Sequence, residues 1–282
     1  DLDTGTVKEK SLQQYVAENG FSRDFVEDYL IPMGAAIWST PSANMMQFPA
    51  ETFFRFFENH GLLHLNEMPQ WQTVVGGSFS YVNAFLRQFK GKVETCAAVS
   101  RIGRKEDAVD ITLDDGTILT FDKVIIATHA DEALKLFERP SAEEQELLGA
   151  WRYNNNYTIL HSDASVMPPN RRAWASWNYY RHDDQNQLAV TYHMNRLQGL
   201  QTSRDYFVTL NSPLPIEPAR IIKEIHYTHP MYTFDAIKTQ NRLPELNGKQ
   251  NTFFCGSYFG FGFHEDAVKS GVAVAKSLGM EL

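Results

Sequence analysis

Residues 252–279, near the C-terminus, constrain the fold of this chain more than any other segment. The segment begins with the apolar run Thr-Phe-Phe-Cys, which is typical of a buried strand. Gly256, Gly260 and Gly262 then open a turn, and a helix is expected over residues 265–278. A helix N-terminus exposes backbone N–H groups and the positive end of its dipole. The pattern therefore predicts a site for an anionic or electron-rich group.

The composition indicates a globular chain of one or two domains. It has 282 residues, of which 43% are hydrophobic and 13% aromatic, enough for a sizeable core. The net charge of −8 argues against nucleic acid as a partner. Cys96 and Cys255 lie in apolar, strand-like runs and are expected to be reduced core residues. No leader or membrane-spanning run is apparent, so a cytoplasmic location is expected, and a peripheral membrane contact stays compatible with the composition.

A second informative segment covers residues 71–128. Gly76 and Gly77 precede an expected helix whose apolar residues recur at helical spacing. Asp115-Gly116 is a strong signal for a hairpin turn, and the last apolar run before position 128 has the composition of a buried parallel strand. Strands are expected at residues 93–102, 108–113, 117–121 and 123–128.

Both segments resemble the flavin-containing amine oxidase family, the monoamine oxidase-like branch of FAD oxidoreductases. That family ends with a glycine after a strand, an aromatic-x-Glu-(Gly/Asp)-Ala helix start, and a Ser-Gly pair one turn later. The sequence Gly-Phe-His-Glu-Asp is most similar to that of bacterial NAD/FAD-binding amine oxidoreductases. Some relatives of those proteins are fused to, or encoded near, cyclopropane-fatty-acid-synthase-like enzymes. Taken alone, the pattern also fits an ordinary strand–turn–helix with glycines for close packing. The matching residues are Gly256, Gly262-Phe263-His264-Glu265-Asp266-Ala267 and Ser270-Gly271.

The resemblance implies an FAD site at this helix start. Phe263 corresponds to an aromatic residue beside the flavin, and the backbone of His264 and Glu265 would stabilise negative charge on the reduced ring. Tyr232 is a candidate second aromatic residue. Val99 matches a position that meets the adenine end of FAD, with a plain core valine as the alternative. The implied catalytic residues are Phe263, His264 and Tyr232, and the implied cofactor-binding residues are Gly76, Gly77, Val99, Gly256, Ser257, Gly262, Phe263, His264 and Glu265.

The implied fold is α/β in class, of a mixed α+β type. A substrate domain with a mixed or antiparallel sheet and helices is expected from residues 1–72 and 131–250. Residues 73–130 and 251–282 would form the C-terminal part of a Rossmann-like FAD-binding domain. No initiator Met and no early Gly-x-Gly-x-x-Gly are present, so we expect a fragment that begins after the N-terminal FAD-binding βαβ unit. FAD binding is expected of the full-length flavoprotein, and whether this fragment binds FAD or is active alone stays open.

Local signals give the expected elements of the substrate domain. Ser11, Ser22 and Pro49 are expected to begin helices, and Pro32 to end or kink the second of them. The Met and aromatic residues of this region are interpreted mainly as core. Strands are expected at 157–160, 173–178 and 188–193, and helices at 129–134, after the capping box at 141–144, around Phe207, at 219–225 and at 234–241. Met33, Trp38, Met45, Met46 and Phe48 are the alternative candidates for an apolar substrate pocket.

The implied activity is oxidation of a small-molecule or lipid substrate, with hydride transfer from a C–H bond to flavin N5. Many amine oxidases place a Lys close to N5, at a strand that corresponds to residues 156–159. Here no Lys occurs between Lys135 and Lys223, so an amine and a lipid acyl chain both stay open as substrates. A non-catalytic module that binds an apolar ligand or a partner is the alternative function. The electron acceptor and the oligomeric state are not indicated.

No metal site is expected from the nine histidines. His60 and His64 have i,i+4 spacing but lack the His-Glu-x-x-His context of a zinc site. His161, His193 and His264 are interpreted as hydrogen-bonded core or pocket residues.

Overall fold

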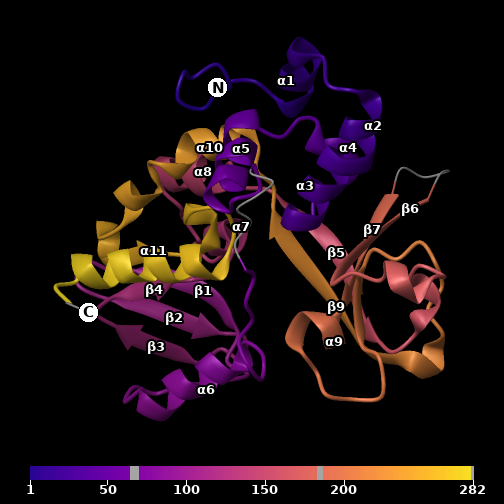
Figure 1. The fold of residues 1–282 in the computed structure, drawn as a ribbon. Coiled ribbons are helices and arrows are strands. Elements are labelled where there is room, and N and C mark those ends of the chain that lie inside the picture. The colour runs from indigo at the N-terminus through magenta and orange to yellow at the C-terminus, as the bar shows by residue number, and fades with distance from the viewer. Residues whose placement is uncertain (64–69, 183–186, 281–282) are drawn as a thin grey trace. The chain divides into compact units, whose positions relative to one another are not determined.

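The computed structural model describes residues 1–63, 70–182 and 187–280, and the chain divides into two compact units. The first unit contains Asp1–Gly91 and Asn154–His229, and the second contains Lys92–Tyr153 and Pro230–Leu282. Each unit combines helices with sheet strands (Figure 1), which confirms the α/β class of mixed α+β type. Residues 131–153 and 230–250 pack in the second unit, so these units differ from the predicted substrate and FAD-binding domains. The assignment of a function to each unit stays a prediction.

The predicted helix starts at Ser11, Ser22 and Pro49 are confirmed in the first unit. The Ser11 hydroxyl accepts a hydrogen bond from the Gln14 N–H (3.2 Å), and Gly20 follows α1 in the left-handed conformation. Pro49 precedes α5 as predicted. Pro32 lies in the first turn of α3, which continues directly from a π-helix, Val26–Leu30. The helices are α1 (Leu12–Asn19), α2 (Arg23–Phe25), α3 (Ile31–Trp38), α4 (Ser42–Met45), α5 (Ala50–Asn59), α6 (Phe79–Gln88) and α9 (Met194–Gln198).

Aromatic side chains form the core of this helical region. The Trp38 ring lies 4.6 Å from that of Phe48 and 4.9 Å from that of Phe56, measured between ring centroids. Phe53 stacks on Phe57 at 4.3 Å. Trp38, Met45 and Phe48 are buried, which confirms the interpretation of these residues as core.

A five-stranded sheet completes the first unit, with the strand order β6-β7-β8-β5-β9. β6 pairs with β7, β7 with β8, and β8 with β5, all antiparallel. The predicted helices around Phe207 and at 219–225 are wrong, because both segments are strands held by sheet pairing. The strand predicted at 173–178 begins only at Trp177, after a 3₁₀ turn. The strands are β5 (Tyr153–His161), β6 (Trp177–His182), β7 (Gln187–His193), β8 (Phe207–Leu210) and β9 (Ile221–Pro230).

His161 is fully buried inside this sheet, as predicted for a core histidine. Its Nδ1 accepts from the Asp163 N–H (3.2 Å), so its Nε2 carries the proton and donates to Thr209 Oγ1 (2.8 Å). Burial lowers the pKa of this imidazole below 6.5, although the Asp163 charge acts in the opposite direction. The folded state therefore holds His161 neutral.

We expect this histidine to make the first unit sensitive to acid. Folding lowers the pKa of His161. The contribution of the neutral imidazole to the free energy of unfolding is therefore present above the unfolded pKa, near 6.5, and is lost as the pH falls towards the folded pKa. His161→Gln should cost about 1–3 kcal/mol at pH 8 through unpaired polar groups. Urea unfolding at pH 8 and pH 5 should show a smaller difference between wild type and variant at pH 5. An unchanged difference would contradict a neutral, acid-sensitive His161.

The second unit contains a three-stranded antiparallel sheet and a parallel strand pair. The predicted Asp115-Gly116 turn joins β2 to β3, and the Thr117 N–H donates to Asp115 Oδ1 (2.9 Å). The first predicted strand begins six residues later than expected. The strands are β1 (Val99–Arg104), β2 (Val109–Leu113), β3 (Ile118–Phe121), β4 (Val124–Ile126) and β10 (Thr252–Phe254). The helices are α7 (Ala130–Lys135), α8 (Ala142–Gly149), α10 (Phe234–Gln240) and α11 (His264–Ser277).

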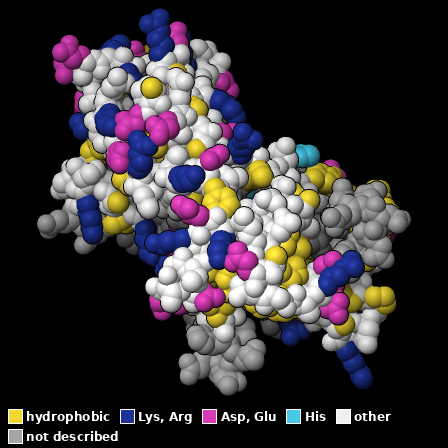
Figure 2. Space-filling view, turned by 90° about the horizontal axis from the view of Figure 1, so that it is seen from above, with side chains coloured by type: hydrophobic (Ala, Val, Ile, Leu, Met, Phe, Trp, Pro, Cys, Tyr) yellow, Lys and Arg dark blue, Asp and Glu magenta, His cyan; other side chains and the backbone are white. Residues whose placement is uncertain are grey.

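Basic and acidic side chains are interspersed over the face seen in Figure 2, with hydrophobic side chains between them. Cys255 is buried as predicted, whereas Cys96 is exposed, because it precedes β1 and lies outside any strand. Within the described part of the chain, no helix is both long enough and apolar enough to span a bilayer.

Candidate functional site

The candidate site begins where the parallel strands β4 and β10 end. Their register places Phe254 opposite Ile126, and the Cys255 N–H continues the ladder to the Ile126 carbonyl (3.1 Å). The parallel pairing of the strand predicted at 123–128 is confirmed, but β4 covers only Val124–Ile126, and Ile125 is exposed between two buried neighbours. Ligands of parallel sheets bind beyond the carboxyl ends of the strands. The loop that follows β10, residues 256–263, occupies that position.

Gly256 fixes the start of this loop against α11. Its N–H donates to the Ser270 hydroxyl (2.9 Å), and the same hydroxyl lies 2.7 Å from the Ala267 carbonyl. A Cβ at Gly256 would lie 2.6 Å from Cε1 of Tyr258, so no side chain fits. Ser257 follows at the start of a 3₁₀ turn, Ser257–Phe259. The predicted cofactor residues Gly256 and Ser257 are therefore held rigidly at the base of the loop.

Tyr232 holds the next part of the loop from inside the second unit. Its hydroxyl donates to the Gly260 carbonyl (3.0 Å), and its ring packs edge-on against Trp151 (5.6 Å). Gly262 has φ 95°, and a Cβ there would lie 2.8 Å from the Tyr232 hydroxyl. Burial raises the pKa of Tyr232, and the charge of Asp266 acts in the same direction, so the phenol stays protonated. The predicted place of Tyr232 beside the flavin stays a prediction.

Gln240 is a loop support that the sequence analysis missed. Its side-chain amide donates to the Gly260 carbonyl (2.7 Å) and to the Tyr258 carbonyl (3.0 Å). A single Gln at the end of α10 has no distinctive local pattern, so no sequence signal pointed to this role. The two carbonyl groups are bound internally, which keeps them away from any ligand of the loop.

The N-terminus of α11 faces solvent. Phe263 is 38% exposed, and His264 and Glu265 are also exposed. The Phe263 N–H is bound by Asp266 Oδ2 (3.0 Å), and the Glu265 carboxylate lies 3.8 Å from the Lys269 ammonium one turn later. The helix therefore presents its positive end at a surface that has an exposed aromatic ring beside it. An acceptor-rich, planar group fits such a surface.

The remaining predicted cofactor residues lie elsewhere in the fold. Gly76 and Gly77 have φ 82° and φ 80° and lead into α6, but they belong to the first unit. Their relation to the loop stays a prediction. Val99 opens β1 in the second unit and is 37% exposed, so its interpretation as a plain core valine is wrong. Its predicted contact with FAD also stays a prediction.

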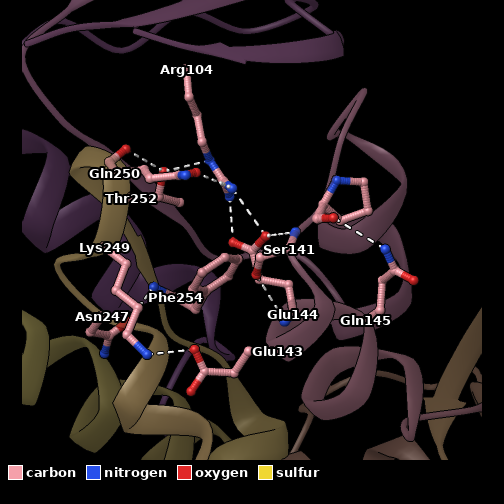
Figure 3. A network of polar contacts seen from close by, with 11 residues as sticks. Arg104, Ser141, Glu143, Glu144, Gln145, Asn247, Lys249, Gln250, Thr252 and Phe254 are labelled. Carbon is pink, nitrogen blue, oxygen red and sulfur yellow. Dashed lines mark hydrogen bonds and ion pairs between the residues drawn. The ribbon is translucent and has the colours of Figure 1, made fainter. Parts of the chain in front are cut away.

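A buried ion pair between Arg104 and Glu144 contacts the first residue of β10 (Figure 3). The Arg104 guanidinium binds both oxygens of Glu144, at 2.5 and 3.0 Å. Arg104 also donates to Thr252 Oγ1 (3.1 Å) and Gln250 Oε1 (2.9 Å), and its guanidinium lies 3.7 Å from the centroid of the Phe137 ring. One side chain of β1 thus joins the predicted capping box of α8 to the first residue of β10.

The described residues do not form a metal centre. In residues 1–63, 70–182 and 187–280 there is no group of three or more His, Cys, Asp or Glu side chains that could hold a metal ion. Of the pair His60 and His64, whose i,i+4 spacing was considered for zinc, His64 lies outside the described residues. His60 Nδ1 lies 2.8 Å from the Phe56 carbonyl. His193 is bound to Asp205 (2.9 Å), and His264 is exposed.

Comparison with known proteins gives a family and a fold. A family model described as flavin containing amine oxidoreductase matches residues 2–198. Solved structures with a similar fold include the following three, and at their sequence identities the likeness shows the fold alone. Cyclohexylamine oxidase from Brevibacterium oxydans IH-35A has a TM-score of 0.63 and 13% identity, over 96% of this chain and 68% of that chain. Putrescine oxidase bound to putrescine has a TM-score of 0.64 and 11% identity, over 97% and 69%. A fatty acid isomerase from P. acnes has a TM-score of 0.59 and 12% identity, over 96% and 67%. No curated protein sequence matches the chain.

Proposed function

Since the chain belongs to the family of flavin-containing amine oxidoreductases, we propose that it is part of an FAD-dependent enzyme that oxidises a substrate C–H bond. The observation that carries the proposal is the exposed N-terminus of α11 behind a loop whose glycines admit no side chain. When bound, FAD supplies the two-electron chemistry by accepting a hydride from the substrate.

The residues of the loop fit such a group. Tyr232 and Gln240 bind the loop carbonyl groups of Gly260 and Tyr258, so these two acceptors are not directed at the acceptor atoms of a flavin. The backbone of His264 and Glu265 would bind and stabilise negative charge at the pyrimidine edge, because it lies at the positive end of the α11 dipole. Phe263 would cover one face of the ring and exclude water from it.

Two substitutions at His264, the first residue of α11, separate the contribution of its backbone N–H to FAD binding from that of its side chain. Proline is tolerated at this position of a helix, and Phe263 before it is already extended (φ −105°, ψ 168°), so His264→Pro removes the N–H and the imidazole, whereas His264→Ala removes the imidazole alone. We expect His264→Pro in the full-length protein to weaken FAD binding about tenfold, the loss of one charge-assisted hydrogen bond. His264→Ala should change it by less than about twofold, because it keeps the N–H. Fluorescence titration with FAD measures both, and equal effects of the two variants would contradict a backbone contact.

We propose a lipid acyl chain, rather than an amine, as the substrate. The strand that corresponds to the Lys-bearing strand of amine oxidases carries the buried Asn156, whose amide donates to the Ser39 carbonyl (3.1 Å) and lies 2.9 Å from His229 Nδ1. No Lys occurs between Lys135 and Lys223. These two points support an acyl substrate over an amine.

Two measurements on the full-length protein test the function and the substrate. Purification with added FAD should give a protein with flavin absorption bands, and a colourless protein would favour the non-catalytic, ligand-binding alternative. Under anaerobic conditions, fatty acyl compounds should bleach the flavin bands, and mono- and diamines should leave them unchanged. Bleaching by amines alone would overturn the acyl assignment and keep the flavin assignment.

A further inference from the structure

A hollow of the first unit lies in its N-terminal helical region, among residues to which the proposed function assigns no role. It has a volume of about 810 Å³ and is lined mainly by apolar side chains. Phe53 and Phe57, both buried, stack on each other in its lining. Phe54 also lines it, and the Phe54 ring lies 4.7 Å from the Tyr15 ring. All the lining residues belong to the first unit.

A ladder of aromatic rings borders this hollow. The Phe25 ring stacks on Phe21 at 5.4 Å and on Tyr29 at 5.4 Å, with interplanar angles of 25° and 28°. Phe25 ends α2 and Tyr29 lies in the π-helix, whereas Phe21 precedes the N-cap Ser22, so it is the ring stacking that places the three side chains next to one another. Each ring remains 39–43% exposed, an unusual position for aromatic side chains that could pack in a core. The rings therefore leave aromatic surface accessible from the hollow.

The charged side chains that line the hollow are all acidic. They belong to Asp1, Asp3 and Glu58, and all three residues are exposed. Asp1 also carries the N-terminal ammonium group of this chain, so Asp3 and Glu58 supply the net negative charge. The Tyr15 hydroxyl donates to Asp1 Oδ2 (2.6 Å), which holds one of these carboxylates beside an aromatic ring. Among the described residues that line the hollow there is no Lys or Arg. Such a site repels a carboxylate or phosphate ligand and attracts a cation.

We propose that this aromatic pocket binds hydrophobic organic cations of the alkylammonium class. Exposed aromatic faces attract a cation through the negative charge of the ring face, and quaternary ammonium groups are bound in this way by aromatic cages. The carboxylates of Asp3 and Glu58 add a second, longer-range attraction. The alkyl chain enters the apolar part lined by Phe53 and Phe57. This binding requires neither FAD nor the oxidation proposed above.

Three probes with the same decyl chain test the charge selectivity by calorimetry, each below its micelle concentration. We expect decyltrimethylammonium to bind the full chain at least about tenfold more tightly than decanoate, with decanol in between. Equal or tighter binding of decanoate would overturn the proposal in favour of a fatty acyl site. Failure of all three probes to bind would also overturn it.

Two variants distinguish the aromatic contact from the apolar one. Phe25→Leu keeps an apolar side chain and removes the ring. It should therefore lower the affinity for decyltrimethylammonium about fivefold and leave the affinity for decanol unchanged. Glu58→Gln keeps the shape of the side chain and removes its charge. It should lower the affinity for decyltrimethylammonium and slightly raise the affinity for decanoate. Phe121→Leu, on the exposed face of β3 in the second unit, is the matched control and should change none of the three affinities. Equal losses of cation and decanol in Phe25→Leu would refute a contact between the cation and the ring.

Discussion

Replacing Arg104 with Met is expected to destabilise the second unit by about 3–5 kcal/mol, because it leaves the Glu144 carboxylate buried without its partner. The side chains of Arg104 and Glu144 are only 11% and 7% exposed, so water cannot replace the lost contact. The variant also loses the bonds from Arg104 to Thr252 and Gln250 that fix the start of β10 (Figure 3). Urea unfolding followed by circular dichroism measures the loss in free energy.

A double variant provides the control for this prediction. Arg104→Met combined with Glu144→Leu removes both charges, and apolar side chains of similar size often restore much of the stability. We therefore expect the double variant to be more stable than Arg104→Met alone. If the two variants unfold at the same urea concentration, the unpaired carboxylate is not the cause of the loss.

The same ion pair should give a dependence on acid. Burial alone would raise the pKa of Glu144, but hydrogen bonds from Arg104 and from the Ser141 N–H outweigh it, so the pKa is lowered on folding. The stabilising contribution of the ionised Glu144 to the free energy of unfolding is then present above the unfolded pKa of about 4.3. It is lost as the pH falls through the lower folded pKa. The difference between wild type and Arg104→Met should accordingly shrink below pH 4.

Gly262→Ala is expected to abolish most FAD binding by the full-length protein, with an affinity loss of at least about tenfold. Gly262 has φ 95°, where an L side chain is strained by roughly 1–3 kcal/mol. Its Cβ would also lie 2.8 Å from the hydroxyl of Tyr232, which is itself bound to Gly260. Relief of that contact requires the loop to move, and the loop leads directly into the N-terminus of α11. Flavin fluorescence titration measures the affinity, and thermal unfolding measures the strain.

Gly271→Ala is the matched control, because it adds the same methyl group to the same segment. Gly271 lies within α11, and a Cβ there would have no atom within 4 Å. Alanine favours the helix by about 0.5–1 kcal/mol, so this variant should be slightly more stable and should bind FAD normally. Normal FAD binding by Gly262→Ala as well would show that the conformation of the loop does not matter for the cofactor.

Sequence patterns predicted the elements whose signals are local. The helix after Phe263 and the strand that begins at Thr252 were correct to within a residue, because an apolar run, glycines and an acidic first turn all lie within one short segment. The turn at Asp115-Gly116 and the cap at Ser141 were correct for the same reason. These features need no distant partner.

Other elements were wrong because distant partners decide them. The segment around Phe207 suggested a helix, but it pairs with β7 on one side and β5 on the other. Tertiary pairing outweighs intrinsic propensity in such strands. Cys96 was interpreted as a core residue from its apolar surroundings, and a core position was the alternative for Val99, yet both are exposed, since an apolar run does not say which of its faces packs.

The sequence by itself determined the family, the mixed α+β class and the strand–loop–helix at the C-terminus, because caps, turns and apolar runs act over a few residues. Only the tertiary structure decided what holds that loop. Tyr232 lies 28 positions from the Gly260 carbonyl that it binds, and Arg104 lies 40 positions from Glu144. It also decided that Trp38 and Phe48 form core while Phe21, Phe25 and Tyr29 line an open hollow. All five are aromatic residues in helical segments or beside them, and their burial depends on which faces meet across the chain.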